Sequence, residues 1–423
     1  MSKEPKRFKQ TEIGELPEEW EVVRLGDVVD IYDNLRIPLS AKQRANMQGE
    51  YPYCGANGVV DYINDYIFDG EYVLLAEDGG YWGAFETSAY IMNGKFWVNN
   101  HAHVLQGKAG VLINHFLMYT LNFMDLTGYV GGTTRGKLTQ SEMKKIPIPL
   151  PPLEEQRRIA GVLRLVDRVA EETKRIINIY ERAKKFALKH LLTRGIGHTR
   201  FKQTEIGELP EEWEVVRLGD VARVFAGSSA PQKREYFENG IFPFVRVQDL
   251  ARYGQTRCLR EVADKVNERA VQEHHMVLAR KGTIVFPKSG AALEKNHRAI
   301  LGVDAYIVSH LAAVEANPEK VSNEFLFWWL CRVDMASLNP NPGYPSIRLE
   351  EIKALPIPLP PLEEQKQIAE MLSIIDAAIE NERRYLGVLE KCKKWMLDNL
   401  LTGKVRLPPK VDEILKGVLP DAF

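Results

Sequence analysis

Cysteine is scarce in this 423-residue chain, and long apolar runs are missing. The four cysteines, Cys54, Cys258, Cys331 and Cys392, lie far apart and form no CxxC pair of the kind that begins a zinc site, so we interpret them as core or surface thiols and expect no metal site. No apolar segment approaches the roughly 20 residues that a membrane-spanning helix needs. The charged segment Met1–Gln10 lacks the apolar region of a secretory signal. We therefore expect a cytoplasmic protein without a membrane segment.

The chain also lacks an excess of charge of either sign. Its 56 lysines and arginines nearly balance 57 aspartates and glutamates, which leaves a formal net charge of −1. This balance argues against a simple basic DNA-binding protein, so any surface that attracts nucleic acid must be local. The length suggests roughly two or three domains.

Internal repetition is the strongest feature that the sequence does contain. The segment Arg7–Val28, RFKQTEIGELPEEWEVVRLGDV, recurs letter for letter at Arg200–Val221. A second block, PIPLPPLEEQ, stands at Pro147–Gln156 and again at Pro356–Gln365. Repeats of this kind indicate that one structural unit occurs twice.

The stretches between the repeated blocks differ. Val29–Lys145 and Ala222–Lys353 share almost no readable similarity and have different lengths. A recent gene duplication without functional meaning is the simplest alternative, but it would have left these stretches alike too. We infer that a constant frame carries two unlike heads.

A long helix is predicted after each PPLEEQ motif. Pro151 and Pro152 suit a first helical turn that needs no N–H groups, and Glu154 and Glu155 lie where the helix dipole favours negative charge. Apolar residues then recur at alternating spacings of four and three, a period typical of coiled-coil packing, with interruptions such as Lys184. The packing positions are Ile159, Leu163, Val166, Ile177, Tyr180 and Leu191 in the first helix and Ile368, Leu372, Ile375, Ile379, Leu386, Leu389 and Leu400 in the second.

Each of these helices should run about 40 residues, or roughly 60 Å. One apolar stripe on so long a helix needs a partner, and the other helix supplies it. Antiparallel pairing is the simplest arrangement and would place the heads at opposite ends of a rod with pseudo-twofold symmetry. Parallel pairing, with both heads at one end, stays open at this point.

The heads are expected to be α+β structures, because short apolar segments bounded by turn residues alternate with helical ones. The expected strands are Tyr72–Ala76, Phe96–Val98, Thr283–Phe286 and Ala305–Val308, and the expected helices are Phe116–Phe123 and Asn323–Cys331. The resulting domains are a first head (1–150), a central helix (151–195), a second head (196–359) and a C-terminal helix with a tail (360–423).

This order of segments resembles the specificity subunit of type I restriction-modification systems along essentially the whole chain. The strongest carriers are IPIPLPPLEEQRRIA at Ile146–Ala160 and LPIPLPPLEEQKQIA at Leu355–Ala369, together with the WEVVRLGDV openings at Trp20 and Trp213. The stretches GANGVVDYIND at 55–65 and GKLTQSEMKKIPIPLP at 136–151 support them.

The resemblance implies that the heads are α/β target recognition domains, each reading one half of an asymmetric bipartite DNA sequence. It also implies that two long antiparallel coiled-coil helices separate the heads, set the spacer and dock two modification subunits. Those partners would carry S-adenosylmethionine, and restriction subunits with ATP and magnesium would join them. The chain itself would bind no cofactor and catalyse no reaction.

Two other classes of protein fit the sequence less well. A DNA methyltransferase should contain a Gly-rich cofactor loop and an NPPY-like motif, and the nearest fragment, NPNP at Asn339–Pro342, lacks the aromatic residue. Clustered carboxylates with a lysine, as nuclease chemistry requires, are not evident either. A coiled-coil scaffold without DNA contact stays the alternative function.

Candidate DNA contacts in the first head lie in Gly-rich and polar segments. GGTTRGKL at Gly131–Leu138 fits GxxxxGK, but Leu138 stands where a nucleotide-binding loop needs Ser or Thr. A loop that contacts phosphates or bases is the sharper hypothesis, and a plain surface turn is the alternative. The candidates are Thr133, Thr134, Arg135 and Lys137 in this loop, Asn57 in the stretch 55–65, and Tyr81, Asn100 and His101.

Each of the last three candidates has a structural alternative. His101 and His103 lack a third metal ligand at helical spacing, so a place in the core or in a polar loop is favoured over metal binding, with DNA contact by Asn99, Asn100 or His101 as the next choice. Tyr81 and Trp82 are either core aromatics or an exposed stacking pair.

The second head contains a basic run from Arg280 to Arg298, in which only Glu294 opposes five cationic residues. A solvated face is one interpretation, and a DNA-facing loop is the other, because basic side chains bind phosphates while amides and hydroxyls read bases. The candidates in this head are Arg246, Gln248, Lys288, Ser289, Asn296, Tyr344 and Ser346.

Overall fold

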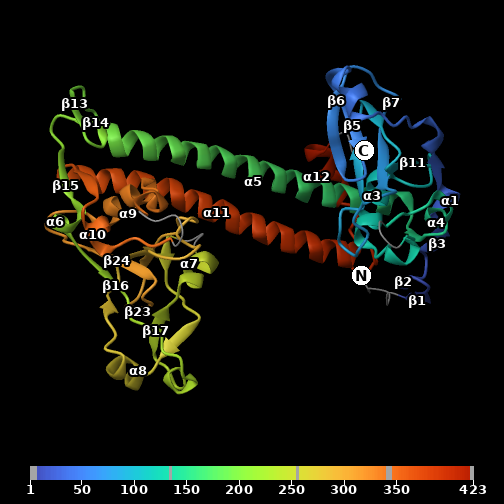
Figure 1. Cartoon of the computed structure of the whole chain (residues 1–423). Helices are drawn as coiled ribbons and strands as arrows, with labels where there is room; N and C mark the ends of the chain where they lie inside the picture. The colour runs from blue at the N-terminus through green and yellow to red at the C-terminus, as the bar shows by residue number, and fades with distance from the viewer. Residues whose placement is uncertain (1–6, 133–135, 254–256, 340–344, 420–423) are drawn as a thin grey trace. The chain divides into compact units, whose positions relative to one another are not determined.

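The computed structural model describes residues 7–132, 136–253, 257–339 and 345–419 (Figure 1). The chain divides into two compact units: unit 1 comprises Met1–Thr173 and Tyr385–Phe423, and unit 2 comprises Lys174–Arg384. Each unit contains one head and part of both long helices, α5 (Leu153–Arg194, 42 residues) and α11 (Leu362–Leu400, 39 residues). The two long helices predicted after the PPLEEQ motifs are therefore present. None of the described helices is long and apolar enough to cross a membrane.

Head 1 is closed by the pairing of its first and last segments. Strand β3 (Glu21–Arg24) runs antiparallel to β12 (Pro147–Leu150). Between them lie two four-stranded sheets, ordered β6-β5-β10-β7 and β4-β11-β8-β9, and helix α3 (Asn114–Phe123) packs on the second sheet. The other elements are β1 (Phe8–Thr11), β2 (Gly14–Pro17), α1 (Leu25–Val28), β4 (Val29–Ile31), η1 (Asp33–Leu35), α2 (Ala41–Ala45), β5 (Gln48–Gly55), β6 (Gly58–Ile63), β7 (Phe68–Asp69), β8 (Tyr72–Ala76), β9 (Ala89–Met92), β10 (Lys95–Val98), β11 (Ala102–Gly107), η2 (Thr127–Tyr129) and α4 (Gln140–Met143).

Head 2 repeats this plan. Strand β15 (Glu214–Arg217) pairs with β25 (Pro356–Leu359), and the sheets are ordered β16-β24-β21-β22-β18 and β19-β17-β23-β20. Helix α9 (Asn323–Arg332) stands where α3 stands in head 1. The other elements are β13 (Phe201–Thr204), β14 (Gly207–Pro210), α6 (Leu218–Val221), β16 (Ala222–Ala226), η3 (Arg234–Tyr236), β17 (Phe242–Val245), α7 (Val247–Tyr253), β18 (Cys258–Leu259), β19 (Asp264–Val266), α8 (Glu268–Glu273), β20 (Leu278–Ala279), β21 (Ile284–Pro287), β22 (Ala299–Leu301), β23 (Ala305–Ile307), β24 (Leu311–Ala316), η4 (Met335–Leu338) and α10 (Leu349–Lys353).

The two heads therefore share a topology that their sequences conceal. The order β4-β11-β8-β9 matches β16-β24-β21-β22, and each head contains one parallel pair in its other sheet, β5 with β10 and β17 with β23. The strands and helices predicted in the heads are confirmed to within two residues at either end.

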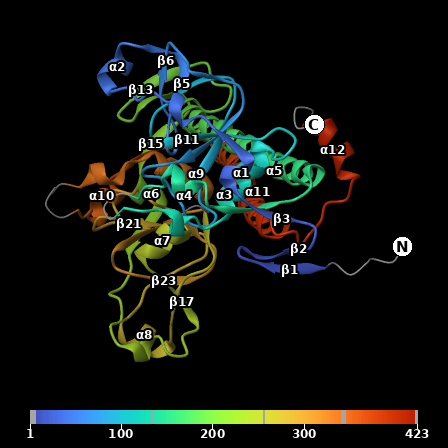
Figure 2. The same cartoon turned by 90° about the vertical axis from the view of Figure 1, so that its right-hand side faces the viewer.

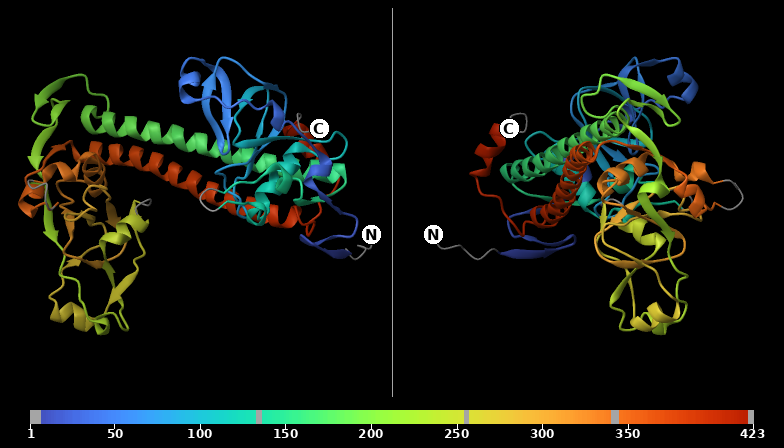
Figure 3. Two further views of the ribbon diagram at one scale, coloured as in Figure 1. Left: turned by 45° about the vertical axis from the view of Figure 1, so that its right-hand side comes forward. Right: turned by 90° about the vertical axis from the view of Figure 1, so that its left-hand side faces the viewer.

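Within unit 2 the long helices run antiparallel. Glu181 and Lys184 of α5 pair with Arg383 and Asp376 of α11, so the partner's number falls as the number in α5 rises. Figure 3 shows the two helices side by side. The antiparallel arrangement is thus confirmed, and the parallel alternative is wrong.

Most of the predicted packing positions are buried or half-buried, with one drift. Ile159, Leu163, Ile177, Ile368, Leu372, Ile379 and Leu400 are buried, and Val166, Leu191, Ile375, Leu386 and Leu389 are half-buried. Tyr180, in contrast, is 36% exposed, and Leu192 rather than Leu191 is completely buried. A helix of 3.6 residues per turn drifts by about 20° per heptad from a strict 3.5-residue repeat, so later positions leave the packed face.

The interruptions of the apolar pattern are ion pairs that recur in both units. In unit 2, Lys184 pairs with Asp376 at 2.5 Å, and its ammonium lies 5.1 Å from the ring centre of Trp328. In unit 1, Lys393 pairs with Asp167 at 2.5 Å and lies 5.6 Å from the ring centre of Tyr119. Counted from the PPLEEQ motifs, the two sets occupy the same positions of the repeat.

The glutamine that ends each PPLEEQ motif joins helix to head. The Gln156 amide accepts from the backbone N–H of Ile113 at 3.0 Å and donates to the carbonyl oxygens of Val111 and Pro151. In unit 2 the Gln365 amide accepts from the N–H of Ser322 and donates to Lys320 and Pro360, so the joint is the same. Both glutamines are completely buried. The repeated sequence is therefore the joint that fixes each helix against the loop before α3 or α9.

The C-terminal tail adds a short helix to unit 1. Helix α12 (Val411–Val418) lies beside the first turns of α5 (Figure 2), where Arg158 forms two hydrogen bonds with Asp412 at 2.8 and 2.9 Å. A Cβ atom at Gly161 would lie 2.7 Å from a methyl group of the buried Leu415, so a larger residue there would have to displace that side chain.

Candidate nucleic-acid interface

Four loops of head 1 meet beside the ends of β5, β8 and β10, and we call this region the head-1 loop edge (residues 55–58, 77–82, 99–101, 131–132 and 136–138). The Asn57 amide donates to the carbonyl oxygen of Gly79 at 3.1 Å, and Gly79 N–H donates to Gly136 at 3.2 Å. The N–H of Glu77 donates to the His101 carbonyl at 2.8 Å. The structure thus brings together Asn57, His101 and Lys137, which lie far apart in the sequence.

The side chains of this edge divide into exposed and buried sets. Tyr81 is 60% exposed, whereas Trp82 is buried and donates from its indole nitrogen to the Ala76 carbonyl at 3.1 Å. The two aromatics are therefore neither a core pair nor a stacking pair: one faces solvent and the other the core. Asn100 is exposed, and the His101 side chain is 38% exposed. Thr133, Thr134 and Arg135 lie outside the described residues.

A buried network of charged side chains packs against the head-1 loop edge. His103 Nδ1 lies 2.6 Å from Asp33 Oδ2, and its Nε2 lies 2.8 Å from the carbonyl oxygen of Leu138. Arg36 pairs with Glu77 at 2.6 Å, and Lys137 pairs with the same carboxylate at 3.2 Å. Burial opposes ionisation of Asp33, but the hydrogen bond from His103 and the positive charges nearby outweigh it and lower its pKa.

The same network contains three side chains that could, by their spacing, bind a metal ion. Ligand atoms of Asp33, Glu77 and His103 lie within 4.8 Å of one another. Arg36 already neutralises both carboxylates, and both ring nitrogens of His103 face protein oxygens. We therefore interpret the cluster as an ion-pair network that holds the loop edge, because a metal would have to displace the guanidinium.

Head 2 builds a matching edge, the head-2 loop edge (residues 246–248, 288–297, 308–310 and 345–347). The N–H of Lys288 donates to the His310 carbonyl at 2.9 Å, as Glu77 does to His101. The N–H of Gly290 donates to Pro345 at 2.8 Å, as Gly79 does to Gly136. Strand-like bridges join Ser289 to Ser346 and Asp78 to Lys137.

One side chain recurs on both edges. His101 Nδ1 lies 3.1 Å from a carboxylate oxygen of Asp78, and His310 Nδ1 lies 2.7 Å from the hydroxyl oxygen of Ser289. Each histidine directly precedes the strand that leads away from the edge, β11 or β24. His310 could not be predicted from the sequence, because the two heads share almost no readable similarity; its only signal is a histidine just before an apolar strand.

A hollow of about 490 Å³ opens on the head-2 loop edge. Arg246, Gln248, Lys295, His297 and His310 line it, together with small apolar residues. Arg246 pairs with Asp264 and lies over the ring of Phe244 at 5.3 Å, which fixes its guanidinium, whereas Gln248 and Lys295 are exposed. Cations and amides around a hollow are the groups that contact phosphates and base edges.

The other predicted contacts of head 2 differ in their exposure and in their hydrogen-bond partners. The Asn296 amide accepts from Arg298 and donates to the Val333 carbonyl, so each of its polar atoms makes a hydrogen bond within the head. Arg298, part of the basic run, is 8% exposed, and burial lowers its pKa. Ser289 is buried behind His310, while Lys288 and Ser346 are half-buried. Tyr344 lies outside the described residues.

Comparison with known proteins gives this arrangement a family. The model of the type I restriction modification DNA specificity domain matches residues 17–181 and 210–391, which takes in both heads and both helices. The MjaVIII specificity subunit of Methanocaldococcus jannaschii is 29% identical over 95% of this chain and 96% of its own length. The EcoDI specificity subunit of Escherichia coli is 23% identical over 97% and 89%.

A solved structure has the same fold. The S subunit of a type I restriction-modification system from M. genitalium superposes with a TM-score of 0.64 over 90% of this chain and 96% of that one, at 15% identity. Two loop edges on one duplicated frame, matched twice by one family model, place the chain in the type I restriction-modification DNA specificity family, whose members are non-catalytic DNA-recognition subunits.

Proposed function

We propose that each head reads one half of an asymmetric, bipartite DNA target through its loop edge. The observation that carries this proposal is that identical backbone hydrogen bonds hold unlike side chains: Asp78 and Lys137 in head 1 correspond to Ser289 and Ser346 in head 2. A constant scaffold with variable polar groups is what two different half-sites require. Two identical edges would instead read an inverted repeat.

The histidine of each edge would present a different hydrogen-bonding atom to DNA. The Asp78 carboxylate only accepts hydrogen bonds, so it places a proton on Nδ1 of His101 and leaves Nε2 of the neutral ring as an acceptor. The Ser289 hydroxyl both donates and accepts, so His310 can adopt either tautomer. Head 1 therefore favours base-edge donors such as adenine N6 or cytosine N4, whereas head 2 is less restricted.

The duplicated frame would dock two copies of one partner and set the spacer. The buried Gln156 and Gln365 joints are the same, so two modification subunits can bind two equivalent surfaces. A helix of the length of α5 is roughly 60 Å long and can span one turn of B-DNA, about 34–36 Å. S-adenosylmethionine, ATP and magnesium would belong to the modification and restriction subunits, and the complex would work on DNA in the cytoplasm.

The experiment that tests the loop edges compares His101→Ala with His310→Ala in the complex with the cognate modification subunit. We expect each variant to weaken binding to DNA that carries its own half-site by roughly 10-fold or more, since a specific base contact contributes about 1–3 kcal/mol. His190→Ala, which changes an exposed histidine on α5, is the control. Equal loss at both half-sites from either variant would contradict independent heads.

The alternative function, a scaffold without DNA contact, predicts a different result in the same assay. For a DNA-binding complex the logarithm of the binding constant falls linearly with the logarithm of salt concentration, because counterions are released. Binding that ignores salt and shows no preferred site would favour the scaffold.

A further inference from the structure

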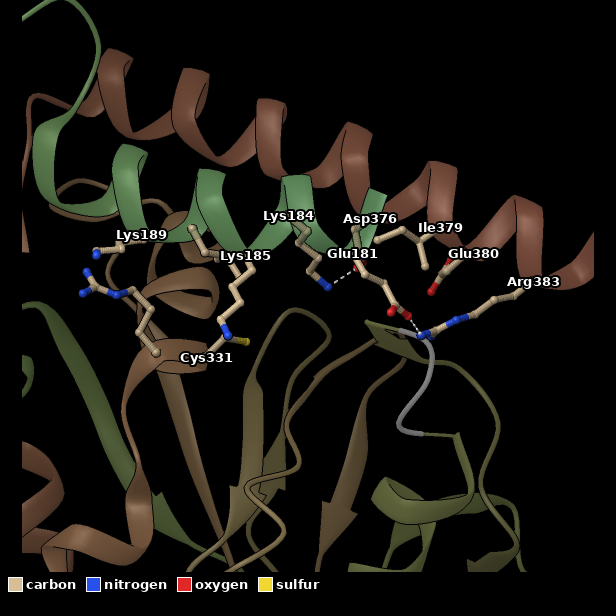
Figure 4. Close-up of a pocket in the computed structure, with 11 residues that line it drawn as sticks. Glu181, Lys184, Lys185, Lys189, Cys331, Asp376, Ile379, Glu380 and Arg383 are labelled. Carbon is tan, nitrogen blue, oxygen red and sulfur yellow. Dashed lines mark hydrogen bonds and ion pairs between the residues drawn. The ribbon is translucent and has the colours of Figure 1, made fainter. Parts of the chain in front are cut away.

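A second hollow in unit 2 is not part of either loop edge. It has a volume of about 700 Å³ and lies between α5, α9 and α11 (Figure 4). Its wall combines five cationic side chains with three carboxylates and has no aromatic residue. The charge on this wall therefore needs an explanation beyond the packing of the helices.

Two of the cations are already neutralised. Lys184 pairs with Asp376 and Arg383 pairs with Glu181, each at 2.5 Å, as the dashed lines in Figure 4 mark. Lys185, Lys189 and Arg332 form no ion pair with any of the residues that the structure describes, although Glu380 lines the same hollow. The remaining charge is three cations against one carboxylate, so the hollow would attract an anion.

The internal repeat shows that the frame does not need these cations. At the positions of unit 1 that correspond to Lys189 and Arg332, the chain has Asp398 and Phe123. The position of Lys185 corresponds to Lys394, which lies 4.8 Å from the ring centre of Phe85. The ion pairs Lys184–Asp376 and Lys393–Asp167, in contrast, are common to both units. The cationic group is thus specific to unit 2 and separate from the joint.

The cationic group adjoins the head-2 loop edge. Arg332 is the last residue of α9, and the carbonyl oxygen of the next residue, Val333, accepts from Asn296 at 3.2 Å and from Arg298 at 2.5 Å. The loop of Asn296 also carries Lys295, which lines the hollow on the loop edge. The Arg332 side chain is exposed, and its guanidinium lies 5.0 Å from the ring centre of Trp329, which holds it beside the hollow.

We propose that Lys185, Lys189 and Arg332 bind backbone phosphates of the DNA that flanks the half-site read by head 2. The proposal rests on the proposed function of the loop edges. Lys185 and Lys189 are exposed on successive turns of α5, as a surface that meets a long polyanion requires. The lining has no aromatic face on which the base of a free nucleotide could stack, and Arg332 adjoins the loop edge through Val333. Both features favour duplex DNA as the ligand.

The test measures DNA binding by the complex with the modification subunit at several salt concentrations. The variants are Lys185→Gln with Lys189→Gln, and separately Arg332→Gln; Lys394→Gln at the matched position of unit 1 is the control. We expect the slope of log binding constant against log salt to become less steep by about 2 for the double variant, since each phosphate contact contributes about 0.9. Affinity for random and specific duplexes should fall by the same factor, and the sequence preference should remain.

Phosphate ethylation interference gives an independent readout. In the wild-type complex, ethylation of one or two phosphates beside the head-2 half-site should block binding, and the double variant should lose this interference. An unchanged salt slope and unchanged ethylation interference in the double variant would overturn the proposal. So would a result in which millimolar ATP abolishes the difference in DNA affinity between the variant and the wild type, because the site would then bind a free nucleotide. A wild-type complex without a preferred site would refute the loop edges instead, which separates the two failures.

Discussion

The indole nitrogen of Trp20 donates a hydrogen bond of 3.1 Å to Oε2 of Glu155, across most of head 1 in sequence. The same bond, from Trp213 to Glu364 at 3.0 Å, occurs in unit 2. Both tryptophans are completely buried, and each lies inside one repeated block while its acceptor lies in the other repeated block. The two repeated blocks therefore contact each other within each unit, and a change of the tryptophan would leave its glutamate partner in the other block without this bond.

Replacing Trp20 with phenylalanine should destabilise unit 1. The change removes the indole donor and leaves a cavity beside Glu155, which keeps its ion pair with Arg406. A lost hydrogen bond to a charged group costs about 1.5–3 kcal/mol, and we expect the free energy of unfolding in urea to fall by that amount. Trp395→Phe, at a position that is 55% exposed, should change it by less than about 0.5 kcal/mol. An equal loss of unfolding free energy in the two variants would contradict a stabilising role for the bond between Trp20 and Glu155.

Replacing Gln156 with leucine should cost more than the tryptophan change. The buried N–H of Ile113 and two carbonyl groups would lose their partner together. Each buried polar group without a partner costs about 1–3 kcal/mol. Urea unfolding of Gln365→Leu should give a loss of similar size because its contacts are the same. Gln203→Leu, at an exposed position, is the control.

The frame could be predicted from the sequence because its signals are local and occur twice. The helix after PPLEEQ follows from its prolines, its first-turn carboxylates and its apolar period. The joint itself could not be predicted from the sequence. The hydrogen bond between the Gln156 side chain and the backbone of Ile113 depends on the packing of the whole head, which no local pattern indicates. Tyr180 shows the other limit, because a small drift in helical phase moves a predicted packing residue to the surface.

The loop edges were only partly predictable for a related reason. His101 and Lys137 stood out because polar residues follow glycines and asparagines there. Asn296 belonged to a basic run, and only the fold reveals that Arg298 and Val333 occupy its amide. His310 became visible once backbone hydrogen bonds, which do not depend on side-chain identity, aligned the two heads.

A double-mutant cycle should find a stronger coupling for Lys184 with Asp376 than for Lys393 with Asp167. The first pair is 27% and 16% exposed and the second 34% and 35%, so solvent screens the first pair less. Partly buried pairs in contact usually couple by about 0.5–3 kcal/mol. Urea unfolding of Lys→Met, Asp→Asn and the double variants measures both couplings. A larger coupling for the second pair would contradict the argument from exposure.

Asp33 should make head 1 sensitive to acid. Its pKa in the folded protein is lowered below the ordinary value of 3.8, because the bond from His103 outweighs burial. A carboxyl group of this kind stabilises the folded state at any pH above the unfolded pKa, and the contribution is lost as pH falls through the lowered folded pKa. Asp33→Asn should therefore lower stability near neutral pH and flatten the fall in stability below about pH 4. The check is urea unfolding across that range, with exposed Glu50→Gln as the control.

Lengthening the frame tests whether α5 and α11 set the spacer. One heptad added to each helix extends it by about 10.5 Å, close to the rise of three base pairs, and keeps the apolar period in register. If the helices fix the distance between half-sites, methylation mapping of the variant complex should find the same half-site sequences with a longer spacer. It should find no methylated sites if the longer spacer rotates the second half-site about the DNA axis, away from its head. An insertion into α5 alone is the matched control, because it breaks the register of pairs such as Lys184 with Asp376 and should destabilise the chain. Methylation of the original sites with the original spacer would contradict the spacer role of the helix pair.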